Sequence, residues 1–347
     1  MNPFEELLAI QREACVVLRG GAARAAACPD LGARVFVDLG GQSLHRLDLA
    51  AVRNPNLPFN NFGGVNLWPA PEGGPFGFNY EGDRWQVQPA INQTPFALRA
   101  RDETAVEMGK RVTLVNRKGT RLPVEITRRV GFGTPAACLA DFPLEVSAAV
   151  ETRDAFAVAD AVSRDDALIA AWNLEQFASS EETVAFVRVD DPRNAINFDY
   201  YEPPPTELVA WRERGFTFRV NGRRKGQIGL RQSSRPEWIG FYDLSRRLVC
   251  VKENRTPRDG LFFNIADNDQ PAGPFSAADI YSIFNSDPDM AAFELETIGP
   301  LLTEGTRLVR SPLVSVTTYA RFASDDAIRA FLDQHLGEGD PPKNRLR

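Results

Sequence analysis

The sequence has little of what several common classes of function require. No run approaches the roughly 20 apolar residues that cross a membrane, so we expect no membrane partner. There is no G-x-G-x-x-G after a predicted strand, no P-loop, no G-x-S-x-G and no H-E-x-x-H. Nucleotide cofactors, serine hydrolysis and zinc proteolysis therefore have no support, and we predict neither a cofactor nor a metal. The formal net charge of −6 argues against nucleic-acid binding, which requires a basic face.

Cysteine is also scarce, and its spacing shows no C-x-x-C pair. The four cysteines are Cys15, Cys28, Cys138 and Cys250. Widely separated cysteines favour free thiols in a reducing compartment over a disulfide. The N-terminal segment carries Glu5 and Glu6 where a secretory signal would have Lys or Arg. We therefore predict a cytoplasmic protein with four free thiols.

Turn-forming and aromatic residues are plentiful instead. The 26 Gly, 25 Pro and 23 Phe favour many turns, short strands and a thick sandwich core over long helices. Segments typical of strands lie at 33–39, 96–101, 110–117, 122–130, 168–177, 183–189, 216–220, 227–232, 238–244, 247–253, 292–299 and 306–322. With no βαβ rhythm, this pattern predicts a mostly β, antiparallel sandwich that spans 1–340 as a single domain, before a polar tail at 341–347.

Two helices and one unusual loop complete the expected elements. The apolar positions of 1–20 suit an amphipathic N-terminal helix, and Ser324 is a good N-cap for a helix over 324–336. The segment 54–85 is rich in Pro, Gly, Asn and aromatic residues, which predicts a long ordered loop of functional importance. The basic residues 223–225 follow Asn221-Gly222 and are typical of a hairpin tip.

Three segments resemble the galactose mutarotase (aldose 1-epimerase) superfamily. They are GARVFVDLGGQSLHRLDL (32–49), NNFGGVNLWPAPEGGPFGF (60–78) and FELETIGPLLTEGTRLVRSPLVSVTTYARF (293–322). The second resembles most closely a set of uncharacterised bacterial members with a Gly-Gly-x-x-Leu-Trp-x-x-Pro loop. The resemblance implies a β-supersandwich with short terminal helices and a cleft for a carbohydrate or polyol.

The resemblance also implies catalytic positions. Glu296, in Leu-Glu-Thr, stands where the family has its base. Neither His45 nor His335 lies in a motif that matches the family's acid. The strand AAWNLEQF (170–177) offers Glu175 instead, and the Gly-rich loop offers Glu72. A pair of carboxylates, Glu296 with Glu72 or Glu175, is therefore the first hypothesis for acid–base chemistry.

Residues for substrate binding follow from strand geometry and side-chain chemistry. A period of two places Glu294 beside Glu296 on one face, which we expect to face water near a cation. The candidates for that cation are Arg111, Arg231 and Lys252. Trp68 suits stacking on a sugar, and the candidate hydrogen-bonding residues are Asn60, Asn61, Asn66 and Gln176. Asn side chains also cap ordinary turns, and Trp85 is expected in the core.

Three functions remain open at this point. The first is a carbohydrate-active enzyme, of the epimerase, isomerase or lyase kind, that uses carboxylates instead of histidines. The second is a non-catalytic carbohydrate-binding module, and the third is a structural or interaction protein. The D-x-D pairs at Asp267/Asp269 and Asp287/Asp289 are more typical of polar turns than of a calcium site.

Overall fold

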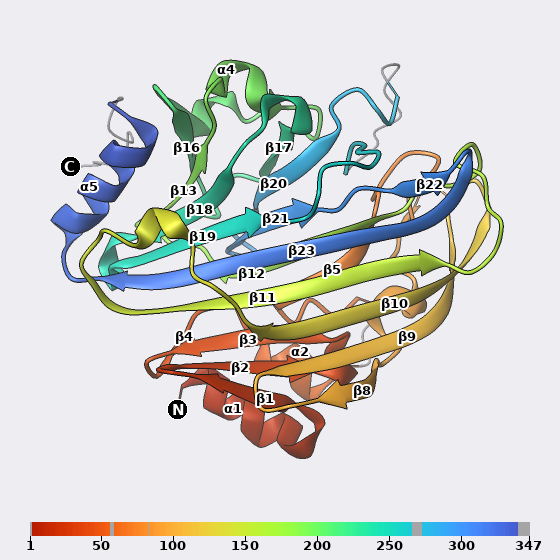
Figure 1. Ribbon diagram of the computed structural model, residues 1–347, viewed down its shortest axis with the longest axis horizontal. Coiled ribbons are helices and arrows are strands. Elements are labelled where there is room, and N and C mark those ends of the chain that lie inside the picture. The colour runs from red at the N-terminus through yellow and green to blue at the C-terminus, as the bar shows by residue number, and fades with distance from the viewer. Residues whose placement is uncertain (1, 56–58, 83, 266–272, 339–347) are drawn as a thin grey trace.

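Two large antiparallel sheets pack face to face and share one hydrophobic core (Figure 1). The computed structural model describes residues 2–55, 59–82, 84–265 and 273–338. The predicted tail at 341–347 and the pair Asp267/Asp269 lie outside these residues. The architecture confirms the predicted mostly β, antiparallel sandwich.

The first sheet has, in spatial order, β1 (Val16–Gly20), β2 (Ala23–Cys28), β3 (Arg34–Leu39), β5 (Gly64–Ala70), β12 (Ala170–Ala178), β21 (Ala292–Ile298), β20 (Asp279–Asn285), β17 (Gly226–Arg231) and β14 (Ile196–Asn197), with β4 (Gln42–Ser43) paired to β3.

The second sheet has, in spatial order, β15 (Val209–Arg212), β16 (Gly215–Arg219), β13 (Thr183–Arg188), β18 (Trp238–Asp243), β19 (Leu248–Asn254), β23 (Arg307–Phe322), β11 (Leu144–Val158), β10 (Arg121–Phe132), β9 (Ala105–Val115) and β8 (Ala97–Arg101), with β22 (Leu302–Glu304) paired to β23. Its long strands β23, β11, β10 and β9 cross the front of Figure 1.

The remaining elements in the described part of the chain are a small hairpin, five α-helices and six 3₁₀ helices of three residues each. The hairpin consists of β6 (Tyr80–Glu81) and β7 (Arg84–Trp85). The α-helices are α1 (Pro3–Gln11), α2 (Leu49–Arg53), α3 (Pro89–Asn92), α4 (Pro192–Ala195) and α5 (Asp325–Leu336). Ser324 caps α5 as expected, because its hydroxyl accepts the Ala327 N–H. None of the helices in the described ranges has the length and hydrophobicity of a membrane span.

Among the strands that were not predicted, β11 and β20 lie inside the sheets rather than at their edges. β11 carries Glu145, Glu151, Arg153 and Asp154, so its sequence has no sustained hydrophobic alternation. It nevertheless pairs along most of its length with β10 and β23. β20 is short and begins at a charged residue, Asp279. Both strands form because their neighbours supply the ladder, an influence of tertiary structure on strand preference.

The N-terminal segment corrects two predictions. The helix ends at Gln11 rather than near residue 20, and Val16 begins β1, where it pairs with Ala27 of β2. That register places Cys15 opposite Cys28, and the two form a disulfide, so the prediction of four free thiols was wrong. The hairpin brings together cysteines that are 13 residues apart. The cysteines therefore no longer support the cytoplasmic prediction.

The Pro- and Gly-rich segment is a strand in its middle, which corrects the prediction of a loop over 54–85. Every residue of β5 is buried, and the strand pairs fully with β12. On its other side β5 pairs with β3 only at Val65. Pro69 lies beyond that single pair, so its missing N–H removes no bond from the β3 ladder.

Candidate functional site

A cavity of about 550 Å³ opens on the face of the first sheet that looks away from the second sheet. Alternation along the strands decides which side chains reach it. On β12, Trp172, Leu174 and Gln176 line the cavity, whereas Glu175 points into the sandwich. The register aligns Leu174 with Glu296 of β21, so that strand presents Glu294 and Glu296 on the same face.

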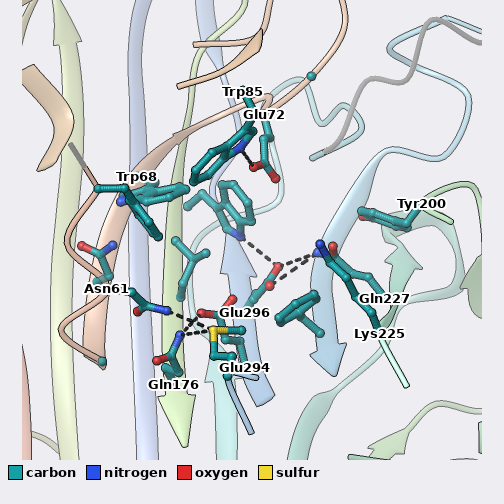
Figure 2. A pocket seen from close by; sticks show the side chains of 18 of the residues that line it. Asn61, Trp68, Glu72, Trp85, Gln176, Tyr200, Lys225, Gln227, Glu294 and Glu296 are labelled. Carbon is teal, nitrogen blue, oxygen red and sulfur yellow. Dashed lines mark hydrogen bonds between the residues drawn. The ribbon is translucent and has the colours of Figure 1, made fainter. Parts of the chain in front are cut away.

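The cavity lining combines carboxylates with many aromatic rings (Figure 2). The acids are Glu72, Glu294 and Glu296. The aromatic residues are Phe59, Trp68, Tyr80, Trp85, Trp172, Tyr200, Tyr201 and Phe284. Arg34 and Lys225 are the cationic residues of the described lining. Such a lining suits a ligand with apolar faces and hydroxyl groups, because rings cover the faces and carboxylates accept hydrogen bonds.

Glu296 lies on the floor of the cavity and is held by neutral donors. The Trp172 Nε1–H donates to its Oε2 at 3.0 Å, and the Gln227 Nε2–H donates to the same oxygen at 3.3 Å. Only 1% of the residue is exposed. Burial and the neighbouring charge of Glu294 raise the pKa of Glu296 well above its usual range. The expectation that Glu296 faces water was therefore wrong, and the side chain is suited to hold a proton.

Glu294 stands next to Glu296 and is half-buried. The Gln176 Nε2–H donates to its Oε1 at 2.7 Å, and Arg46 in turn donates to the Gln176 amide oxygen at 3.0 Å. Burial raises the pKa of Glu294, and the positive charge of Arg34 opposes that rise. The cation expected near this pair is thus Arg34, rather than Arg111, Arg231 or Lys252.

Glu72 lies across the cavity from this pair, at the edge of the small hairpin (Figure 2). The Trp85 Nε1–H donates to its Oε1 at 2.7 Å. Burial raises the pKa of Glu72, and the Trp85 bond and the charge of Lys225 lower it. Trp85 itself is 40% exposed, so the expectation of a core position for it was wrong.

Tyr200 forms another part of the wall and is anchored by a buried acid. Its hydroxyl donates to Oδ2 of Asp279 at 2.9 Å, and the Asn197 Nδ2–H donates to both carboxylate oxygens at 3.2 Å. Burial raises the pKa of Asp279 to about 6. A Cβ at Gly229 would lie 2.3 Å from Oδ1 of Asp279, so glycine is needed for this close approach.

Glu175 and Lys252 do not line the cavity. They form an ion pair of 2.7 Å inside the sandwich, where His45 Nε2 also lies 2.9 Å from Glu175. Thr317 donates to Glu175 at 2.6 Å, and Tyr319 donates to its Oε1. Burial alone would raise the pKa of Glu175, but Lys252 and His45 outweigh it and hold that pKa well below its usual range.

The other candidate residues fall into two groups. Asn61, Asn66, Trp68 and Gln176 line the cavity together with the three glutamates. Asn60 and Arg231 do not: Asn60 is buried with its Nδ2–H donating to the Pro55 carbonyl, and Arg231 donates to the Ser276 carbonyl. The D-x-D residue Asp287 caps a turn, because its carboxylate accepts the Met290 N–H.

Several lining residues were not predicted, and most come from distant parts of the chain. Lys225 was expected at a hairpin tip, but β16 and β17 belong to different sheets, so no hairpin forms there. Tyr200 and Tyr201 lie in a Pro-rich connection, YYEPPP, whose aromatic pair was the available signal. Trp172 lies four residues before Gln176 on the same strand, so a period of two places both side chains on one face and could have identified Trp172 from the sequence.

In the described ranges, no group of three or more His, Cys, Asp or Glu side chains is placed to hold a metal ion.

Proteins of known structure have the same sandwich fold as this chain. A family of unknown function, DUF6786, matches residues 5–306. A putative aldose 1-epimerase of Escherichia coli superposes with a TM-score of 0.50 at 12% identity, covering 88% of this chain and 98% of that one. A galactose mutarotase related enzyme of Lactobacillus acidophilus superposes with a TM-score of 0.51 at 9% identity, covering 89% and 99%. These similarities confirm the mutarotase-like fold. No curated protein matches the sequence.

Proposed function

The chain belongs to the DUF6786 family of unknown function. We propose that its cavity binds a carbohydrate and acts on it by acid–base chemistry. One observation carries the proposal: Glu72, Glu294 and Glu296 line a single cavity of about 550 Å³ together with aromatic rings. The mutarotase-like fold supports a carbohydrate as the ligand at the level of the scaffold.

The pKa directions suggest the roles of the two catalytic carboxyls. Reactions at the anomeric carbon need one group to give a proton to the ring oxygen and another to take one from the hydroxyl. Burial and the charge of Glu294 raise the pKa of Glu296 well above its usual range, which favours the protonated form, so Glu296 serves as the acid. Burial raises the pKa of Glu72 as well, but the Trp85 hydrogen bond and the charge of Lys225 oppose that rise, so Glu72 is the easier of the two to ionise and serves as the base. This assignment exchanges the roles expected from the family resemblance.

Binding of free sugars tests this function. We would record melting temperatures of the protein with neutral sugars, sugar phosphates and uronic acids at millimolar concentration, because a ligand of the native state raises the melting temperature. Glu296→Gln should lose the shift, and Glu103→Gln, which changes an exposed glutamate outside the cavity, should keep it. If no sugar stabilises the protein, the proposal is wrong.

A second function is favoured by the positions of the histidines. His45 lies inside the sandwich against Glu175, and His335 lies on α5, where its Nε2 is 2.9 Å from the Cys138 carbonyl. Neither lines the cavity. A non-catalytic carbohydrate-binding protein would need the rings and amides but no acid–base pair. NMR exchange between the anomers of a bound sugar separates the two: exchange that depends on both Glu296 and Glu72 indicates an enzyme.

A further inference from the structure

Trp85 is the feature of the cavity that a single sugar ring leaves unexplained. It is 40% exposed, although the other two cavity tryptophans, Trp68 and Trp172, are 6% and 2% exposed. An exposed indole leaves a large apolar surface in contact with water, although burying that surface would stabilise the fold. Trp85 is nevertheless held in a fixed position, because its Nε1–H donates to Glu72 at 2.7 Å. A fixed and exposed ring at the entrance of a cavity is a typical stacking platform.

Aromatic rings continue without a gap from Trp85 to the floor. The Trp85 and Phe59 ring centroids are 5.0 Å apart, and those of Phe59 and Trp68 are 5.9 Å apart. Trp68 is 6.1 Å from Trp172, whose indole N–H binds Glu296. Each aromatic ring is about as wide as a pyranose, so this row of rings extends beyond one sugar.

The size of the cavity agrees with that length. A pyranose displaces roughly six waters, or roughly 200 Å³ at the ~30 Å³ that each water occupies in the liquid. The cavity of about 550 Å³ exceeds this value more than twofold. Figure 2 shows Trp85 and Glu72 on one side of this space and Glu294 with Gln176 on the other. One ring placed at Glu296 therefore leaves the part next to Trp85 for a second ring.

We propose that the cavity binds the end of an oligosaccharide of at least two units, with the terminal ring at Glu296 and the next ring stacked on Trp85. The inference rests on the proposed function and specifies its ligand.

The test compares sugars of increasing length. We would titrate the protein calorimetrically with α- and β-linked gluco-, galacto-, xylo- and chito-oligosaccharides of one to four units. In one series at least, affinity should rise roughly tenfold from one unit to two or three. Trp85→Ala should remove that gain and lower monosaccharide affinity much less, whereas Trp85→Phe, which keeps a ring but loses the hydrogen bond to Glu72, should keep part of the gain. Leu98→Ala, which removes another exposed large side chain that is not part of the cavity lining, is the control.

The outcomes separate this inference from the proposed function. Equal affinity for one and several units, or equal loss of both in Trp85→Ala, would overturn the second-ring site while monosaccharide binding at Glu296 still stands. Absence of binding across all of these oligosaccharides would overturn the second-ring site, and the proposed function would fall as well only if no sugar phosphate or uronic acid stabilises the protein. A length-dependent gain that survives Trp85→Ala would place the second ring elsewhere and contradict the assignment to Trp85.

Discussion

Glu175 and Glu296 occupy adjacent strands of one sheet, are almost fully buried, and have opposite surroundings. Glu175 faces the interior of the sandwich, where Lys252 lies at 2.7 Å and His45 at 2.9 Å. Glu296 faces the cavity, where the neutral side chains of Trp172 and Gln227 donate hydrogen bonds to it. The pKa of Glu175 is held well below its usual range, and that of Glu296 is raised well above it.

This difference separates a structural carboxylate from a candidate functional one. A nearby cation and several donors stabilise the ionised form of Glu175, whose carboxylate bonds Lys252, Thr317 and Tyr319 of the second sheet. A buried carboxyl with neutral donors and an acidic neighbour is costly to ionise, and proteins retain such groups at sites that handle protons. The interior face of the first sheet therefore carries a buried ion pair, and its cavity face carries the candidate functional carboxyls.

The largest expected effect is on the interior face. Glu175→Gln leaves the Lys252 ammonium buried without its counter-charge, so we expect a loss of about 3–5 kcal/mol of unfolding free energy in urea titrations. Adding Lys252→Met should restore part of that loss, because the unpaired charge is gone. A loss below about 1 kcal/mol in the single variant would show that the pair does not stabilise the fold.

Asp279 extends the comparison along the cavity face. Its folded pKa of about 6 lies above the ordinary 3.8, so the folded state keeps a proton that the unfolded state has already lost between these values. Its contribution to stability is present below about pH 4 and is lost as the pH rises through 6, at a cost of about 3 kcal/mol. Asp279→Asn should lack this fall. Unfolding measured from pH 4 to 8, with the exposed Asp289→Asn as control, checks the difference.

Glu296→Gln should stabilise the fold, whereas Glu175→Gln should destabilise it. The raised pKa means that ionisation of Glu296 destabilises the fold as the pH rises through its folded value. Glutamine carries no such charge, so we expect the variant to be more stable than the parent protein, with a larger difference at pH 8 than at pH 5. Melting temperatures at both pH values measure this. If Gln at both positions destabilises equally, the contrast between the two faces is wrong.

Glu72→Gln should change stability least. The glutamine amide oxygen can still accept the Trp85 indole N–H, and the site is only half-buried. We expect a change within about 0.5 kcal/mol. In the same variant, anomer exchange of a bound sugar should fall while binding persists, which denaturation and NMR measure side by side. Loss of the fold would instead make Glu72 a structural residue.

Much of the fold was predictable because strand alternation and turn residues act locally. The alternation around Glu296 correctly placed Glu294 on its face, and Ser324 correctly marked the start of α5. The strands β5 and β11 were missed because their sequences look like a loop and a polar segment, and only pairing with neighbours makes them strands. Cys15 and Cys28 likewise become partners only through the β1–β2 register.

By itself, the sequence determined a mutarotase-like sandwich, and it also singled out Glu72, Glu294 and Glu296. It could not decide between Glu72 and Glu175 as the partner of Glu296, because a period of two defines two faces without saying which one a second sheet will cover. Only the tertiary structure placed Lys252 over Glu175 and brought Lys225 and Tyr200 from distant connections to the cavity. The physical reason is that burial and charge partners depend on packing between sheets, which no local pattern encodes.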